Sequence, residues 1–222
     1  MVVISEIAPN IFRISIFAPS ANLQFNHFLV KDNEPLLYHT GLRHIGYSHF
    51  ESDECGSLNE WRAAAPNADV ICSQVGAFVN MGDFMDKAPR ALPDGATFAT
   101  GKYRFRYCQT PHLPHGWDAG ALFEETQKTL FCSDLFHHVG NVEPLTSEDV
   151  AGRSHQSLKD YQAGILAAYV PYTPLTAQNL KKLADLKPKT LAIMHGSSFT
   201  GDGSKALDDL NEALRDLFGP QK

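Results

Sequence analysis

The sequence predicts an α/β fold, because strand-like and helix-like segments alternate along the chain. Residues 11–17 alternate apolar and polar side chains, as a half-buried strand does. Residues 58–65 place Leu58, Trp61 and Ala65 at helical spacing, and Pro66 ends that segment. Near the end of the chain, a last helix is predicted from one apolar stripe: Leu207, Leu210, Leu214 and Leu217.

The remaining elements are expected in a similar alternation. Short apolar runs predict strands at residues 28–30, 36–38, 70–72 and 190–194, and hairpins are expected within residues 97–111 and 121–134. A long helical region is expected over residues 157–186, interrupted by Pro171 and Pro174. This order favours two sheets covered by helices on their outer faces.

Length and composition favour one domain over residues 1–222, since no linker rich in Gly, Ser or Pro divides the chain. The net charge of -6 comes without a basic stripe, so nucleic acid is not an expected partner. No apolar run approaches the roughly 18 residues of a membrane span, and no charged leader begins the chain. A cytoplasmic protein without a membrane partner is expected.

The four cysteines lie far apart and form no CxxC pair, so neither a disulfide framework nor a thiolate zinc site is indicated. The acidic and histidine residues are more informative, because several of them follow predicted strands directly. His49, His115, Asp134 and His195 each stand just past a strand end. Ligands gather at the carboxyl ends of strands in open α/β sheets, so these four side chains are expected to converge.

The densest group of metal donors is His49, Glu51, Asp53 and Glu54. Alternation after a strand would point the first three toward a shared side, and a helix starting near Asp53 could carry Glu54 to a second ion. The alternative is an ordinary helix N-terminus, with Ser52 or Asp53 as the N-cap and Glu54 in the first turn. That alternative explains the presence of Asp53 and Glu54 but not that of His49 and Glu51.

The HxExD motif at His49, Glu51 and Asp53, followed by Glu54 and Gly56, resembles the ligand motif of the flavodiiron proteins and related oxygen-binding di-iron proteins of the metallo-β-lactamase superfamily. The resemblance extends over residues 26–41, 111–118, 130–136 and the segment ending at Gly203. It implies the four-layer αββα sandwich of the metallo-β-lactamase fold.

The resemblance also implies a ligand set for two metal ions. His49, Glu51 and His115 correspond to the first metal, Asp53, Glu54 and His195 to the second, and Asp134 to the bridging ligand. His115 is preferred to His112 because it leads into Gly116, Trp117 and Asp118. Glu54 departs from the family, which usually has a histidine there. The residues expected around the metals or lining the pocket are His39, His112, Trp117 and His138.

Three imidazoles and four carboxylates without a thiolate favour iron, with manganese or zinc as alternatives. The resemblance implies binding or reduction of O2 or NO, as a sensor or as a reductase. Electrons would come from a separate redox partner, since 222 residues leave no room for the family's flavodoxin domain and no flavin is expected. The alternative is a dinuclear metal-dependent hydrolase of an ester, lactone or thioester. The hydrolases of the superfamily normally carry a histidine where this chain has Glu51.

Overall fold

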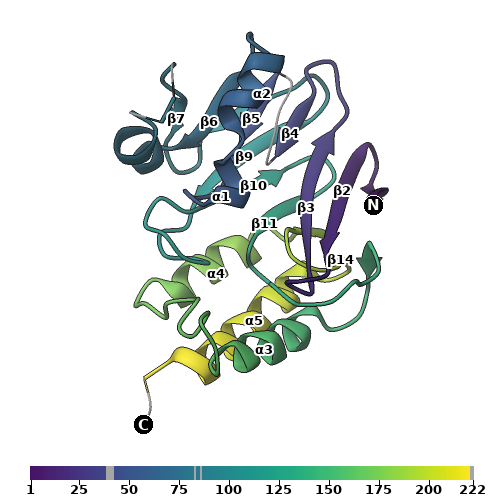
Figure 1. Cartoon of the computed structure of the whole chain (residues 1–222), viewed down its shortest axis with the longest axis vertical. Coiled ribbons are helices and arrows are strands. Elements are labelled where there is room, and N and C mark those ends of the chain that lie inside the picture. Colours follow the sequence, from purple (N-terminus) through teal and green to yellow (C-terminus); the bar gives the residue numbers. More distant parts are fainter. Residues whose placement is uncertain (39–42, 83, 86, 221–222) are drawn as a thin grey trace.

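Two seven-stranded sheets face each other in the computed structural model, which describes residues 1–38, 43–82, 84–85 and 87–220 (Figure 1). The first sheet has the strand order β1-β2-β3-β4-β5-β6-β7. Its members are β1 (Val2–Ala8), β2 (Ile11–Ala18), β3 (Leu23–Val30), β4 (Leu36–Tyr38), β5 (His44–Gly46), β6 (Asp69–Ser73) and β7 (Arg90–Leu92).

The second sheet has the order β12-β14-β13-β11-β10-β9-β8. Its members are β8 (Thr97–Ala99), β9 (Arg104–Gln109), β10 (Gly120–Glu124), β11 (Thr129–Ser133), β12 (Leu145–Thr146), β13 (Thr190–Ile193) and β14 (Ser198–Thr200). Strand β11 is parallel to β13, and both β9 and β11 are antiparallel to β10. Strands β9, β11 and β13 therefore end at the same edge of the sheet.

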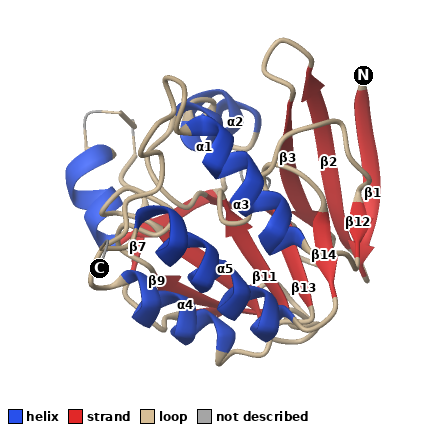
Figure 2. Cartoon of the chain, turned by 90° about the horizontal axis from the view of Figure 1, so that it is seen from below, coloured by secondary structure: helices blue, strands red, loops and turns tan. Residues whose placement is uncertain are grey.

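Helices cover the outer face of each sheet (Figure 2). The first sheet carries α1 (Ser52–Cys55), α2 (Leu58–Ala64) and a short π-helical turn (Gly76–Asn80), and the second carries α3 (Val150–Tyr161), α4 (Thr176–Ala184) and α5 (Gly203–Phe218). Buried apolar side chains form one cluster between the sheets and one beneath each helical layer. The fold is therefore the expected four-layer αββα sandwich of the metallo-β-lactamase type.

Both faces of the second sheet are buried, which explains its nearly continuous apolar strands. In β11, Leu130 and Cys132 join the cluster under α3, α4 and α5, whereas Phe131 joins the cluster between the sheets. The Phe131 ring lies 5.8 Å from the ring of Phe28 and 5.3 Å from that of Tyr38. Alternate side chains of one strand thus join separate layers of the sandwich.

Several predicted boundaries need correction. The helical region expected at residues 157–186 is two helices, and the first begins at Val150 because Asp149 caps it by accepting a hydrogen bond from the Gly152 amide. The strand expected at residues 28–30 begins at Leu23, and its cross-strand partner β2 has the predicted alternation. The N-cap of α1 is Glu51 rather than Ser52 or Asp53, and its side chain makes no capping bond. That the chain forms one domain stays a prediction.

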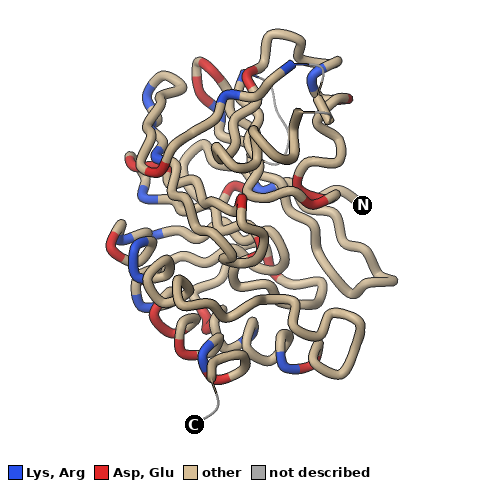
Figure 3. Tube along the Cα trace, turned by 90° about the vertical axis from the view of Figure 1, so that its left-hand side faces the viewer, with Lys and Arg blue, Asp and Glu red and all other residues tan. Residues whose placement is uncertain are grey.

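Charged residues of both signs are interspersed along the trace seen in Figure 3. None of the helices in the described residues is long and apolar enough to cross a membrane.

Replacing Leu207 by Ala tests the packing of α5 on the second sheet. Leu207 is fully buried, so the variant should lose about 2–5 kcal/mol of unfolding free energy, measured by urea unfolding. Leu166→Ala is the matched control, because that side chain is 41% exposed and should cost less than about 0.5 kcal/mol. Equal losses in the two variants would contradict the packing of α5.

Candidate metal centre

Four strand ends deliver the candidate ligands to one edge of the sandwich. His49 follows β5 of the first sheet, and His115, Asp134 and His195 follow β9, β11 and β13 of the second. Glu51 is brought in by the same loop as His49, directly before α1. The convergence expected from strand ends is therefore present, and it joins residues from both sheets.

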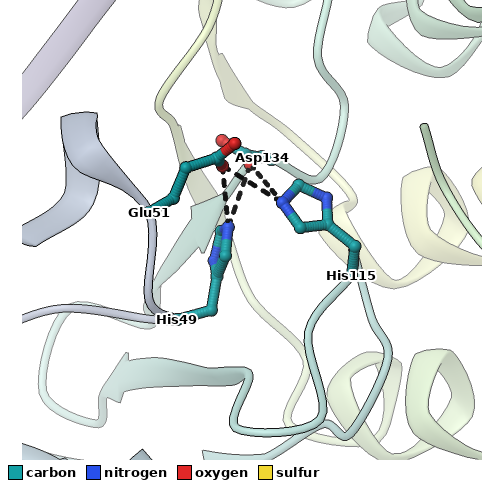
Figure 4. A group of neighbouring side chains, drawn as sticks. All are labelled: His49, Glu51, His115 and Asp134. Atoms are coloured by element: carbon teal, nitrogen blue, oxygen red, sulfur yellow. Dashed lines mark hydrogen bonds and ion pairs between the residues drawn. The ribbon is translucent and has the colours of Figure 1, made fainter. Parts of the chain in front are cut away.

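One group of four side chains has the spacing of a metal site (Figure 4). One ligand atom each of His49, Glu51, His115 and Asp134 lies within 4.8 Å of all the others. Glu51 Oε2 is 3.1 Å from both His49 Nε2 and His115 Nε2. Asp134 Oδ2 is 3.5 Å from His49 Nε2 and 3.6 Å from His115 Nε2. We call these four residues the first cluster.

A second set of donors lies on the other side of Asp134. His195 Nε2 is 3.1 Å from Asp134 Oδ1 and 3.3 Å from Asp53 Oδ2. We call Asp53, Asp134 and His195 the second cluster. The two oxygens of one carboxylate therefore face two separate groups, an arrangement that would let Asp134 contact two cations at once.

The polar atoms of Asp134 support the presence of a bound cation. Its side chain is only 1% exposed, and neither oxygen makes a hydrogen bond of standard geometry with a described residue. The Oδ1 atom of Asp53 is likewise buried without a hydrogen-bond partner among the described residues. Burying a carboxylate without compensation is costly, and a divalent cation would supply that compensation. The imidazole and carboxylate donors suit iron, manganese or zinc.

The buried carboxylates shift the pKa values of the neighbouring histidines. Burial opposes protonation of His49 and His195, but the favourable interactions with neighbouring carboxylates outweigh it and raise the pKa to about 9 for His49 and about 10 for His195. The partners are Glu51 for the first histidine and Asp134 and Asp53 for the second. Hydrogen bonds with His115 and His49 lower the pKa of Glu51 to about 2.

His195 is held in place by the first sheet. Its Nδ1–H donates to the Gln24 carbonyl at 2.9 Å, which leaves Nε2 facing the carboxylates. The next carbonyl, of Gly196, accepts hydrogen bonds from Asn26 Nδ2 at 2.9 Å and Arg13 Nη2 at 3.0 Å. A ligand carried by the second sheet is thus oriented by buried polar groups of the first.

Unusual backbone conformations gather at the loops that carry the ligands. Ser133 has φ 52° directly before Asp134, and Phe136 has φ 65° just after it. Gly196 has φ 120°, and a Cβ there would stand 2.3 Å from the His138 ring. Left-handed backbone at residues other than glycine costs free energy and concentrates at functional sites.

Asp118 holds the loop that carries His49 and Glu51. Its Oδ2 accepts hydrogen bonds from the Phe50 amide at 3.0 Å and from Asn80 Nδ2 at 2.9 Å. The side chain is buried, so these bonds fix the loop against the end of the sandwich.

Aromatic side chains that the sequence analysis missed pack over the histidines. The Tyr169 ring is 4.9 Å from the His115 ring, and the Tyr161 hydroxyl lies 2.8 Å from His137 Nε2. The His137 ring is 4.7 Å from that of His195, and burial together with the charge of His195 lowers its pKa to about 3. Tyr161 and Tyr169 lie far from any motif, so only the folded chain reveals them.

The residues expected around the metals behave differently from one another. His112 is exposed and Trp117 is 53% exposed, so the structure brings His115 and neither of these side chains to the first cluster. His138 uses both ring nitrogens inside the fold, since Nδ1 donates to the Phe136 carbonyl and Nε2 accepts from the Ser197 amide. It supports the loop of His195 and does not line the centre. His39 lies outside the described residues.

Glu54 does not point to the second cluster as expected. Its carboxylate accepts hydrogen bonds from the Ser48 amide at 3.0 Å and from the Ser133 hydroxyl. The side chain is buried behind His49. In the described residues these two donors hold the Glu54 carboxylate beside His49, and Glu54 as a ligand of the second ion is not supported by a contact with that cluster.

A cavity of about 310 Å³ borders Asp53. Its walls include Asp53, Glu54, Ser52 and Ser57, and the apolar side chains Val2, Ile14, Ile16, Leu37 and Trp61. The first cluster has its own access, since Glu51 is 43% exposed and His115 is 19% exposed. Small molecules could therefore approach the centre from two directions.

The family model for the ODP beta-lactamase family matches residues 12–196. No curated protein matches the sequence significantly. Among solved structures, rubredoxin oxygen:oxidoreductase from Desulfovibrio gigas is similar with a TM-score of 0.78 and 17% identity, over 95% of this chain and 61% of that one. The flavodiiron protein from Giardia intestinalis has a TM-score of 0.75 and 18% identity, over 97% and 60%.

A third similar structure is a fragment of a putative diflavin flavoprotein from Nostoc sp., with a TM-score of 0.73 and 14% identity. The alignment covers 96% of both chains. The chain thus spans about three fifths of the first two proteins and nearly all of the Nostoc fragment. At these identities the likeness concerns the fold.

Metal affinity should fall as the pH falls. With pKa values of about 9 and 10, His49 and His195 are protonated at pH 7 in the metal-free protein, and a metal must displace both protons. Each displaced proton weakens binding about tenfold for every pH unit lost. Co²⁺ affinity measured at pH 6, 7 and 8 against a competing chelator checks this. An affinity independent of pH would contradict the prediction.

Proposed function

The chain belongs to the ODP beta-lactamase family, and from that membership we propose that it is a cytoplasmic non-haem di-iron protein that binds, and with an electron donor reduces, O2 or NO. The proposed ligands of the first iron are His49, Glu51 and His115. Asp53 and His195 bind the second iron, and Asp134 bridges the two. Electrons come from a separate redox protein.

The observation that carries this proposal is the position of the Glu51 carboxylate in the first cluster. Its carboxylate lies between two imidazoles of the first cluster, 3.1 Å from each, and its lowered pKa keeps it charged at neutral pH. An anionic ligand reduces the Lewis acidity on which hydrolysis depends and stabilises the higher oxidation state of iron. Carboxylate at this position therefore favours redox chemistry over hydrolysis.

The surrounding residues protect such a centre. Asp134 and His195 are buried, and Tyr169, His137 and Tyr161 pack over the histidines. Excluding water in this way strengthens the electrostatic interactions inside the site. When bound, two ferrous ions would each supply one electron to a diatomic ligand. The similar protein from Desulfovibrio gigas is named for rubredoxin and oxygen, which is compatible with this proposal.

Hydrolysis of an ester, lactone or thioester is the second candidate. The observation that favours it is the cavity of about 310 Å³ beside Asp53, whose apolar walls could receive an acyl group. Zinc in the purified protein together with esterase or lactonase turnover would support this candidate.

Metal content separates the two candidates. Protein purified without oxygen should contain two irons per chain by elemental analysis, and mixing it with NO or O2 in a stopped-flow spectrometer should change its absorbance. Removal of the iron with a chelator should abolish this absorbance change, and adding ferrous iron back should restore it. Two zincs per chain after growth with ample iron would reject the proposed function.

The bridging assignment predicts the behaviour of Asp134→Ala. Removing a ligand common to both ions should reduce the bound metal from two ions per chain to fewer than one, measured by elemental analysis after equilibrium dialysis. Asp208→Ala is the matched control, because Asp208 is exposed on α5. Retention of both metals in Asp134→Ala would show that Asp134 does not bridge.

A further inference from the structure

The carboxylate of Glu54 lies behind His49, opposite the metal-facing side of that imidazole. Glu54 is 1% exposed, and its Oε1 atom is 3.8 Å from His49 Nδ1. The other ring nitrogen of His49, Nε2, faces Glu51 and Asp134. Glu54 therefore lies next to Nδ1 of His49, whereas Glu51 and Asp134 of the first cluster lie next to Nε2.

Two further contacts hold the carboxylate there. The Ser48 amide donates to Oε2 at 3.0 Å, and the Ser133 hydroxyl donates to Oε1. Two hydroxyls lie near His49 Nδ1, that of Ser48 at 3.2 Å and that of Ser133 at 3.5 Å. Ser133 reaches this position through the left-handed backbone that precedes Asp134. The same turn thus places Asp134 in the centre and supplies a donor to Glu54.

These contacts leave the two clusters unequal. The first cluster has four donor residues, whereas the second has Asp53, His195 and the shared Asp134. The Asp53 side chain is also 24% exposed, in contrast to the 1% exposure of Asp134. Fewer protein donors and more water at a ligand both weaken metal binding.

We propose that Glu54 is a positioning residue for His49, and that the two metal positions consequently differ in affinity. The first cluster fills first, and the second binds its ion in a separate, weaker step. At 3.8 Å the Glu54 carboxylate acts on the His49 ring through its negative charge and through the Ser133 hydroxyl that lies near both, and this raises the basicity of the ring and strengthens the first position. This inference rests on the proposed function, because it requires a centre for two metals.

Anaerobic calorimetric titration of the metal-free protein with Co²⁺ tests the proposal. The wild-type chain should show two resolved binding steps. Glu54→Gln should weaken the tighter step about 10- to 100-fold, because the charge behind His49 is lost, and should change the weaker step by less than about threefold. Asp53→Asn should remove the weaker step and keep the tighter one. Glu212→Gln, an exposed substitution on α5, is the matched control.

A second variant guards against a folding defect in Glu54→Gln. Ser133→Ala removes the hydroxyl that donates to Glu54 and lies beside His49 Nδ1, and it leaves the metal-facing nitrogen of His49 unchanged, so it should also weaken the tighter step selectively. In both variants, the ¹⁵N chemical shift of His49 Nδ1 in the Zn²⁺-loaded protein should change, while that of His195 Nδ1 should not. A purely structural role for Glu54 would alter both histidines or neither.

Two results would overturn the inference. One is loss of the weaker step in Glu54→Gln with the tighter step unchanged, which would make Glu54 a ligand of the second metal. The other is a single step for two equivalent Co²⁺ ions in the wild-type chain. Both results leave the proposed two-metal function intact. A wild-type chain that binds no metal would instead reject the proposed function itself.

Discussion

The buried carboxylate of Asp134 is the constraint on which the centre depends. It lies between His49 and His115 on one side and His195 on the other, with almost no exposure to solvent. A charge in this position requires compensation by cations, either protonated imidazoles or metal ions. The raised pKa values of His49 and His195 show the first kind of compensation in the metal-free protein. A bound metal ion would replace the protons as the compensating positive charge.

The sandwich supplies the rigidity that this exchange requires. Asp134 follows a strand that is buried on both faces, and His195 is fixed through the Gln24 carbonyl of the opposite sheet. Arg13 and Asn26 hold the next carbonyl in the chain, and Asp118 holds the loop of His49. The ligands are thus oriented by hydrogen bonds between layers, which is why they stay close together despite their charge.

The environment differs between the two clusters, and this difference connects the structure to its proposed chemistry. Glu51 adds an anionic donor to the first cluster, while Glu54 is withdrawn from the second and placed behind His49. Both carboxylates therefore lie close to His49, on the side of Asp134 that faces the first cluster. Two ions held in this way would differ, because the negative charge is concentrated at the first cluster and the second cluster has fewer protein donors.

The sequence by itself determined the α/β alternation of elements, and the resemblance of its ligand motif implied the four-layer αββα arrangement. Seven candidate ligands were predicted, and the structure brings six of them together. Strand periodicity and donors placed at strand ends depend only on neighbouring residues, so they can be recognised without tertiary structure. The direction of Glu54 could not be recognised in this way, since Ser133, which holds it, is 79 residues away in the chain. The same holds for Tyr161 and Tyr169, and for the Gln24 carbonyl that orients His195 across 171 residues. Tertiary structure alone decided these features, because each depends on a contact between distant segments that no local pattern records.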